Sequence, residues 1–411
     1  MSVRAQIAVG PFGVPPAIPL VPMVEQAVRR VVVDTHVHLP DMFEITFLDE
    51  GGLLANNKID IGTSVKIWGG AVDSPDAPAL IEGEVTAIEA DIQGNVCFTT
   101  IRGYEKAHRM QRVRRTYVYR NMKDSDIAAM MALKYGLVTA RPQIDTTDGV
   151  HDALAQFNQS DWDFLKYRAS ENGYDFGVVQ GAFVFRKPKE AGNALLLGLF
   201  PLPGGPPKLT VGEDLLVFRP RVTGASQVPT VMVRAWDPTA RQVIIGKADA
   251  QTVQVDLDDV DQAKDMFAKF VIPPRIPDIP IPVLFPGTGA SIEWAVKEAL
   301  PTSVNGDVYA IVDRAISTAS QADGMAQSLA EHVASTFAEA EGTCAGNPLV
   351  QAGMSISVAN TPGYFSGCWV VTNARHVFDE EDPHEPYLTH FVVSGRQERS
   401  LLGLASLGQS N

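Results

Sequence analysis

The sequence predicts an α+β protein that is mainly β, and three observations carry this prediction. Segments in which apolar and polar residues alternate recur before residue 112 and again after residue 209. Between these two regions, residues 160–186 read as a capped helix followed by two short strands. A long helical pattern over 320–340 precedes the last strands.

The first β region follows from its alternation. Phe43, Ile45 and Phe47 alternate with polar residues, which predicts a strand over 42–48. Further strands are expected near 61–69, 80–92 and 96–105, with a turn at Gln93-Gly94-Asn95. About five strands of this length are enough for a small barrel. Residues 1–25, rich in Pro and Gly, are expected to form an extended arm that needs another surface to become ordered.

The middle of the chain is predicted to be mixed. Asp124 is expected to cap a helix that runs to Tyr135. Ser160 and Gly173 have the residue types that begin and end a helix, and the strands 174–179 and 183–185 follow it. Trp162, Leu165 and Ala169 share one face of this helix, so Trp162 and Leu165 are predicted core residues.

The second β region has expected strands at 213–222, 229–237, 353–359, 365–376 and 387–397. The helix over 320–340 is predicted from the spacing of Met325, Leu329, Val333 and Phe337. Residues 248–316 contain an acidic patch and a Pro-rich stretch at 272–286, which is expected to be extended. Two β regions would fit an internal duplication, which residue identity does not demonstrate.

Composition excludes several classes of protein. Of the 411 residues 45% are hydrophobic and 20% charged, which is typical of a globular chain of two to four domains. No apolar run has the length of a membrane span, and the N-terminus does not read as a signal peptide. A net charge of -14 disfavours non-specific nucleic-acid binding. The spacing of Cys97, Cys344 and Cys368 favours a reducing compartment over a disulfide framework or a zinc cluster.

One motif favours a competing function. Asp34-Thr35-His36-Val37-His38 places two imidazoles on one face of a strand, and it resembles the first strand of metal-dependent amidohydrolases. Such a barrel needs a helix after this strand and further ligands at later strand ends. Here Leu39-Pro40 leads directly into another strand, and no second histidine pair is placed to complete a site. We therefore predict that His36 and His38 bind no catalytic metal, and the hydrolase remains the alternative.

Other polar residues have simpler interpretations. The basic run Arg102, Lys106, Arg109, Arg112, Arg114, Arg115 and Arg120 is conceivable as a nucleic-acid patch, but pairing with acidic neighbours is favoured. Glu331, Glu339 and Glu341 are expected on an exposed helix face or at a helix end. Cys344 is interpreted as a packed turn residue. No catalytic, cofactor-binding or metal-binding residue is assigned, and no enzymatic activity is predicted.

Four passages together resemble a known family. They are Ser160-Asp-Trp-Asp-Phe with the rest of 160–186, then 81–92 with 99–109, 209–221 with 231–238, and 340–350 with 363–372 and His376. In wording, order and spacing they resemble the VgrG-type hub and spike proteins of contractile injection systems, a family shared with the late control protein D of contractile-tailed phages. The N-terminus looks most like that of extracellular injection particles.

The resemblance implies a structural hub that joins a six-fold inner tube to a three-fold spike. Two similar β-barrel domains with inserted α+β domains would form a ring of three subunits, hence six barrels. The implied domains are an arm at 1–27, a first barrel at 28–111, an α+β domain at 112–190, a second barrel from 191–247 with 341–400, an insert at 248–340 and a linker at 401–411. An enzyme domain within 248–316 is a third possibility.

The implied partners are further copies of the chain, the inner tube or its initiator, the spike tip and baseplate wedge components. No cofactor, no nucleic acid and no membrane in the resting state are expected. Assembly is expected in the bacterial cytoplasm, as part of a phage-tail-like particle that can be released. The 401–411 end looks like a linker, and we expect it to point toward the spike, near the three-fold axis.

Overall fold

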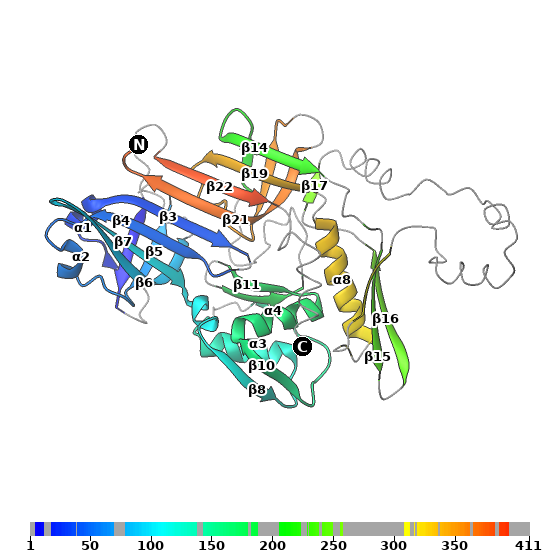
Figure 1. Cartoon of the computed structure of the whole chain (residues 1–411). Coiled ribbons are helices and arrows are strands. Elements are labelled where there is room, and N and C mark those ends of the chain that lie inside the picture. The colour runs from blue at the N-terminus through cyan, green and yellow to red at the C-terminus, as the bar shows by residue number, and fades with distance from the viewer. Residues whose placement is uncertain are drawn as a thin grey trace, which may run out of the picture.

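The computed structural model is mainly β, which confirms the predicted fold class (Figure 1). The residues it describes are 5–11, 18–37, 39–69, 79–137, 143–179, 182–187, 205–222, 228, 230–237, 241–249, 255–257, 308–312, 316, 319–335, 338–361, 365–382 and 386–393. The Pro-rich stretch 272–286, most of the acidic patch and the linker 401–411 lie outside these residues.

A large, mostly antiparallel sheet forms the body of the molecule, and its main path runs β14-β19-β22-β21-β3-β4-β7-β6-β5-β1-β2. Its N-terminal strands are β1 (Gln6–Gly10), β2 (Ile18–Pro19), β3 (Val28–His36), β4 (Met42–Leu48), β5 (Ser64–Trp68), β6 (Ala79–Gln93) and β7 (Val96–Glu105). Its later strands are β13 (Lys208–Thr210), β14 (Leu215–Val222), β17 (Val255–Leu257), β19 (Ala338–Ala345), β20 (Ser355–Ala359), β21 (Gly367–Asp379) and β22 (Tyr387–Val393). Strands β3 and β21, distant in sequence, pair side by side at its centre (Figure 1).

The N-terminal segment corrects the prediction of an extended arm. Strand β1 pairs along the whole of β5, so it belongs to the sheet of its own chain. Pro22–Ala27 forms helix α1, with Val24 fully buried in the core beneath β4. A second short helix, α2 (Leu53–Asn56), follows β4.

A separate α+β domain lies below the sheet in Figure 1. It contains the 3₁₀-helix η1 (Lys106–Met110), β8 (Arg114–Tyr119), α3 (Asp124–Lys134), β9 (Gln143–Ile144), β10 (Leu154–Ser160), α4 (Asp161–Asn172), β11 (Asp175–Val179) and β12 (Ala182–Arg186). Helix α4 has the predicted caps, because the Asp163 amide donates to Ser160 Oγ at 3.0 Å and Gly173 is left-handed at φ +67°. Trp162 and Leu165 are buried, as predicted, and Lys123 rather than Asp124 is the N-cap of α3.

A third unit differs from the predicted domain boundaries. Strands β15 (Thr230–Asp237), β16 (Gln242–Asp249) and β18 (Val308–Val312) form their own sheet, in the order β16-β15-β18, and α8 (Ala319–Ser335) packs on it (Figure 1). The sequence placed 229–247 in the second barrel, but β15 and β16 pair with β18 and not with the large sheet. Hydrophobic burial against α8 explains the difference, because Val231 and Val233 have no exposed surface.

Helix α8 also ends earlier than predicted. By Ala338 the chain is already strand β19, in which Ala338 and Ala340 point into the core. Phe337 lies outside the described residues. Within the described residues, no helix has both the length and the apolar character needed to cross a membrane.

Candidate functional site: a duplicated sheet with two open edges

The large sheet is built from two copies of one five-strand motif. Strands β3 to β7 are the first copy and pair in the order β3-β4-β7-β6-β5. Strands β14, β19, β20, β21 and β22 are the second copy and pair in the order β14-β19-β22-β21-β20. The two copies agree in the order of their strands along the chain and in the order in which the strands pair. Strand β14 takes the place of β3, and the third unit is inserted between β14 and β19.

Two pairs of equivalent β-bulges fix the residue-by-residue correspondence. The bulge between Val28 and Arg30, on β3 against β4, matches the one between Leu215 and Val217, on β14 against β19. Through their partners this correspondence equates Phe47 with Cys344. A bulge marks a defined position in a ladder, so it is a stronger landmark than a side chain.

The second pair of bulges gives the same residue correspondence independently. The bulge after Val85, on β6 against β7, matches the one after Val371, on β21 against β22, which equates Gly103 with Val393. Their partners across the sheet are Phe43 and Ala340. Four residues further along these strands the match is again Phe47 with Cys344.

Turn hydrogen bonds repeat in both copies. The Gly62 amide donates to the Val85 carbonyl at 2.8 Å, and the Gly353 amide donates to the Val371 carbonyl at 2.8 Å. These glycines have φ +91° and +80°, in the left-handed region that glycine tolerates best. After β4 and β19, the Asp49 amide donates to the carbonyl of Cys97 and the Gly346 amide to that of Tyr387. The backbone of the motif is therefore conserved within the chain.

Core side chains differ between the copies and compensate across strands. In the first copy Phe43 lies over Gly103, where an added Cβ would be 2.3 Å from the ring. In the second copy the ring belongs to Phe391 and the glycine is Gly342, at the neighbouring inward-facing positions. Large and small residues alternate across facing strands so that each layer is filled.

The repeated sheet ends in two strand edges that no described residue pairs. Strand β6 pairs with β5 only as far as Glu84, so its edge over 87–93 is open. Its residues 88–93 are exposed, and Ile92 retains 70% of its surface. At the other end β14 pairs with β19 on one side, and Leu216 and Val217 are exposed. Open edges with apolar residues are typical sites of strand addition.

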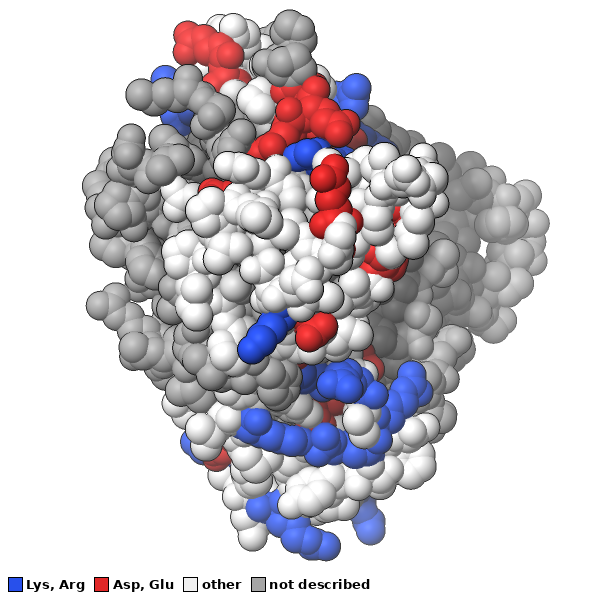
Figure 2. Space-filling model, turned by 90° about the vertical axis from the view of Figure 1, so that its left-hand side faces the viewer, with Lys and Arg blue, Asp and Glu red and all other residues white. Residues whose placement is uncertain are grey.

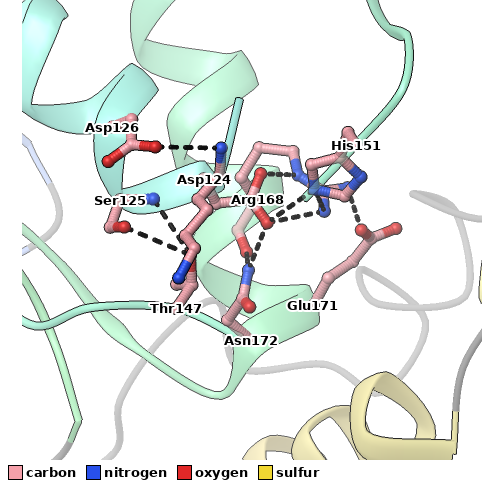
Figure 3. Close-up of polar contacts among 9 residues, drawn as sticks. Asp124, Ser125, Asp126, Thr147, His151, Arg168, Glu171 and Asn172 are labelled. Carbon is pink, nitrogen blue, oxygen red and sulfur yellow. Dashed lines mark hydrogen bonds and ion pairs between the residues drawn. The ribbon is translucent and has the colours of Figure 1, made fainter. Parts of the chain in front are cut away.

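The α+β domain is held by a buried ion-pair network (Figure 3). Arg168 of α4 donates to both oxygens of Asp124 on α3, at 2.6 and 2.9 Å, and also contacts Glu171. His151 and Asn172 complete the contacts of Asp124. Burial alone would raise the Asp124 pKa, but these hydrogen bonds and the Arg168 charge hold it below its usual range.

A second buried carboxylate joins three elements of the same domain. Asp161, at the start of α4, is contacted by Arg115 of β8 at 3.0 Å and by Lys134 of α3 at 2.9 Å. Gln156 and Tyr135 also donate to it. With both carboxylates compensated, these clusters have the character of structural supports.

Part of the predicted basic run pairs as expected. Arg102 contacts Glu44 and Glu89 at 2.7 and 2.5 Å, and Arg109 contacts Glu84. Figure 2 shows Lys and Arg gathered over the lower part of one face, with Asp and Glu mostly over the upper part.

His36 and Val37 lie where the first copy meets the α+β domain, near Lys166 of α4 and Gly177 of β11 respectively. His36 ends β3, and its amide donates to Asp41 Oδ1 at 2.8 Å, while burial lowers the pKa of its ring. His38 lies outside the described residues. Strand β3 continues directly into antiparallel β4, which is not the alternating strand–helix order of an amidohydrolase barrel. No group of three or more His, Cys, Asp or Glu among the described residues is placed to hold a metal.

Sequence reasoning missed a pair of buried carboxyl groups beside His36. The Asp41 backbone hydrogen-bonds to the Glu105 carboxyl group, and the Glu105 amide donates to the Asp41 carbonyl at 3.0 Å. Burial raises the pKa of both groups, and repulsion from Asp41 adds to the rise for Glu105 while repulsion from Asp34 adds to it for Asp41. Their spacing in sequence gives no signal, because only the β4–β7 pairing brings them together.

The remaining predicted residues are structural in the described fold. Cys344 is buried within strand β19 and not in a turn, and burial raises the pKa of its thiol to about 12. Glu339 and Glu341 alternate with the buried residues of β19 and so lie on its outer face, not on a helix. Such positions favour packing and solvation over catalysis.

The fold defines a duplicated, sheet-building protein, and solved structures of tail proteins share this fold. The prophage MuSo2 43 kDa tail protein of Shewanella oneidensis superposes with a TM-score of 0.58 at 12% identity, covering 95% of this chain and 98% of that one. A tail protein of Neisseria meningitidis superposes with a TM-score of 0.58 at 10% identity, covering 95% and 96%. A chain of the Francisella PdpA–VgrG complex gives 0.50 at 8%, covering 96% of this chain and 53% of that one.

At these identities the likeness establishes the fold. No match was found among curated protein sequences. The chain belongs to the Alg8 N-terminal domain family, which matches residues 61–266.

Proposed function

We propose that the chain is a structural baseplate hub of a contractile injection system. Three subunits form a ring that joins a six-fold inner tube on one face to a three-fold spike on the other. The observation that carries this proposal is the duplication: each chain presents the same five-strand motif twice, so three chains present it six times. A ring of this kind is closed by heterologous contacts and needs no bond chemistry.

The fold comparisons support the tail-particle setting. Two tail proteins, one of them from a prophage, share the fold over nearly their whole length, and a chain of the Francisella PdpA–VgrG complex shares it over about half of its own. The proposed partners are therefore the inner tube or its initiator, the spike tip and baseplate wedge components. Assembly in the bacterial cytoplasm, followed by incorporation into a phage-tail-like particle, is part of the same proposal.

The proposed domain division follows the two copies. The first barrel domain is 28–111, and the α+β domain is 112–190. The second barrel domain combines β13, β14 and β17 with 338–393, and the unit of β15, β16, β18 and α8 is inserted into it. This placement explains how a long insertion is tolerated, because it replaces the short connection between β3 and β4 in the first copy.

A non-enzymatic role agrees with the chemistry of the polar clusters. Arg168 with Asp124 and Arg115 with Asp161 are compensated ion pairs inside one domain. The hydrolase alternative needs a barrel that the antiparallel order around His36 does not provide. Nothing in the described geometry favours it.

Native mass spectrometry of the purified chain, alone and with its tube and spike partners, tests the proposal. We expect a species of three chain masses under at least one of these conditions. A chain that stays monomeric beside both partners would refute the trimeric hub.

A further inference from the structure

The contact between the two copies inside one chain is a template for a contact between chains. Strand β21 of the second copy pairs with β3 of the first, antiparallel, from Asn373 with His36 to Asp379 with Arg30. In the first copy the strand equivalent to β21 is β6, and in the second copy the strand equivalent to β3 is β14. These are the two strands whose edges no described residue pairs.

We infer that the β6 edge, residues 87–93, pairs antiparallel with β14 of a second copy of this chain, in the register of β21 with β3. The inference rests on the proposed ring and names the contact that closes it. Transferring the internal register through the two bulge correspondences puts Glu89 opposite Arg221 and Asp91 opposite Arg219 of the neighbouring subunit.

Charge complementarity supports this register. Asp34 and Arg375 are paired residues at the internal contact, and their equivalents across the subunit boundary are Arg221 and Glu89. The signs are exchanged, yet the pair remains opposite in charge. A shift of one residue would place both arginines against the apolar face of β6.

Apolar burial supports it as well. The same register places Ile92, which is 70% exposed, opposite Phe218 of the neighbour. Their internal equivalents, Phe378 and Val31, retain only 4% and 1% of their surface. Joining the edges would therefore place Ile92 in the kind of contact that removes these internal equivalents from water.

Pro220 explains why this edge does not pair indiscriminately. The Val37 amide donates to the Thr372 carbonyl at 3.1 Å, so alternate residues of β3, including Val33, direct their amides toward β21. Pro220 is the equivalent of Val33 and has no N–H, so the inferred ladder lacks one bond opposite Ala90. A proline of this kind is confined to sheet edges and weakens pairing with unrelated strands.

Cysteine cross-linking tests the register. Asp91 and Arg219 of the neighbour would occupy a non-hydrogen-bonded pair, where Cα atoms lie about 4.5 Å apart, within the range of a disulfide. Within one chain these residues lie at opposite ends of the repeated sheet, on the order of 30 Å apart by strand spacing. The variant Asp91→Cys with Arg219→Cys, in a Cys97→Ser and Cys368→Ser background, should give covalent dimers and trimers under mild oxidation.

The matched control is Asp91→Cys with Arg221→Cys, two residues out of register, together with each single cysteine variant. We expect at least a tenfold lower yield of cross-linked species from these. Equal yields would overturn the register. A chain that is trimeric by native mass but does not cross-link would overturn the edge pairing while the proposed function stands. A chain that is monomeric beside its partners would overturn both.

Charge reversal gives a second test that does not depend on disulfide geometry. Asp91→Arg should weaken the ring because it faces Arg219, and Arg219→Asp in the same chain should restore it. The trimer fraction is read by native mass, and circular dichroism confirms that each variant is folded. Folded variants with unchanged trimer fractions, or a double variant weaker than the single one, would contradict the contact.

Discussion

Gly62 and Gly353 are equivalent residues in two copies of one motif. Each has a positive φ, each precedes the third strand of its copy, and each donates its amide to the valine before a β-bulge. Both hydrogen bonds have the same length of 2.8 Å. The duplication is therefore evident in the backbone geometry of the sheet.

Replacing Trp162 with alanine should destabilise the α+β domain by about 3–5 kcal/mol, because it empties a large buried site. The ring packs against Phe176 in a tilted arrangement with 4.7 Å between centroids, and Trp162 is 2% exposed. Phe157→Ala is the matched control, since that ring is 73% exposed and its loss should change stability by less than about 0.5 kcal/mol. Chemical denaturation measures both, and equal effects would contradict the assigned core.

Gly103→Ala should destabilise the first copy by about 1–3 kcal/mol. The new Cβ would lie 2.3 Å from the Phe43 ring and 2.3 Å from the Glu84 carbonyl oxygen. Gly324→Ala in α8 is the control, because its Cβ would meet its neighbours no closer than 3.4 Å. A thermal melt that ranks the two variants in the opposite order would show that the close approach of β4, β6 and β7 is wrong.

Removing Arg168 alone should destabilise the protein more than removing Arg168 together with Asp124. Arg168→Met leaves a buried carboxylate without its cation, and we expect a loss of about 3–5 kcal/mol. Adding Asp124→Leu should recover part of that loss. A double variant as unstable as the sum of the two single variants would show that the two groups do not interact.

The same pair should make folding stability depend on pH in the acidic range. The Asp124 pKa is lowered in the folded state, so its contribution is present above the unfolded-state pKa, near 4, and is lost as pH falls below it. Asp124→Asn should flatten this part of the pH profile, measured by urea unfolding between pH 2 and 6. An unchanged profile would exclude Asp124 as its source.

Asp41 and Glu105 should make folding stability depend on pH in the direction opposite to Asp124. Burial raises their pKa in the folded state, so stability is lost as pH rises from the unfolded-state value near 4 through the folded-state pKa. Glu105→Gln keeps the shape and removes one charge, so it should raise stability at pH 8 relative to pH 5. A variant that loses stability equally at both pH values would contradict the assigned repulsion.

The sequence predicts those elements whose signals are local. Ser160 and Gly173 are sufficient to bound α4, and the alternation of Phe43 and Ile45 is sufficient to place β4. The sequence does not show where α8 ends. The apolar residues of the helix, spaced by four, are followed closely by the alternating apolar residues of the next strand, so the two patterns merge. Here Ala338 and Ala340 belong to the strand.

The duplication could not be read from residue identity for a physical reason. A smaller side chain at one position is compensated by a larger one at the paired position on the next strand. The pair Ile45 and Ile101 of the first copy corresponds to the pair Gly342 and Phe391 of the second. Each pair fills its layer, so neither residue alone is constrained. The partner of Asp41 was hidden for a similar reason, since only strand pairing brings Glu105 beside it.

The rotational symmetry of the assembled particle tests the central claim most directly. We expect class averages of the purified ring from electron cryo-microscopy to show three subunits around a channel, with six similar lobes on the face that meets the tube and three on the opposite face. A ring with any other number of subunits, or three subunits whose two copies of the motif do not alternate around one axis, would contradict the account.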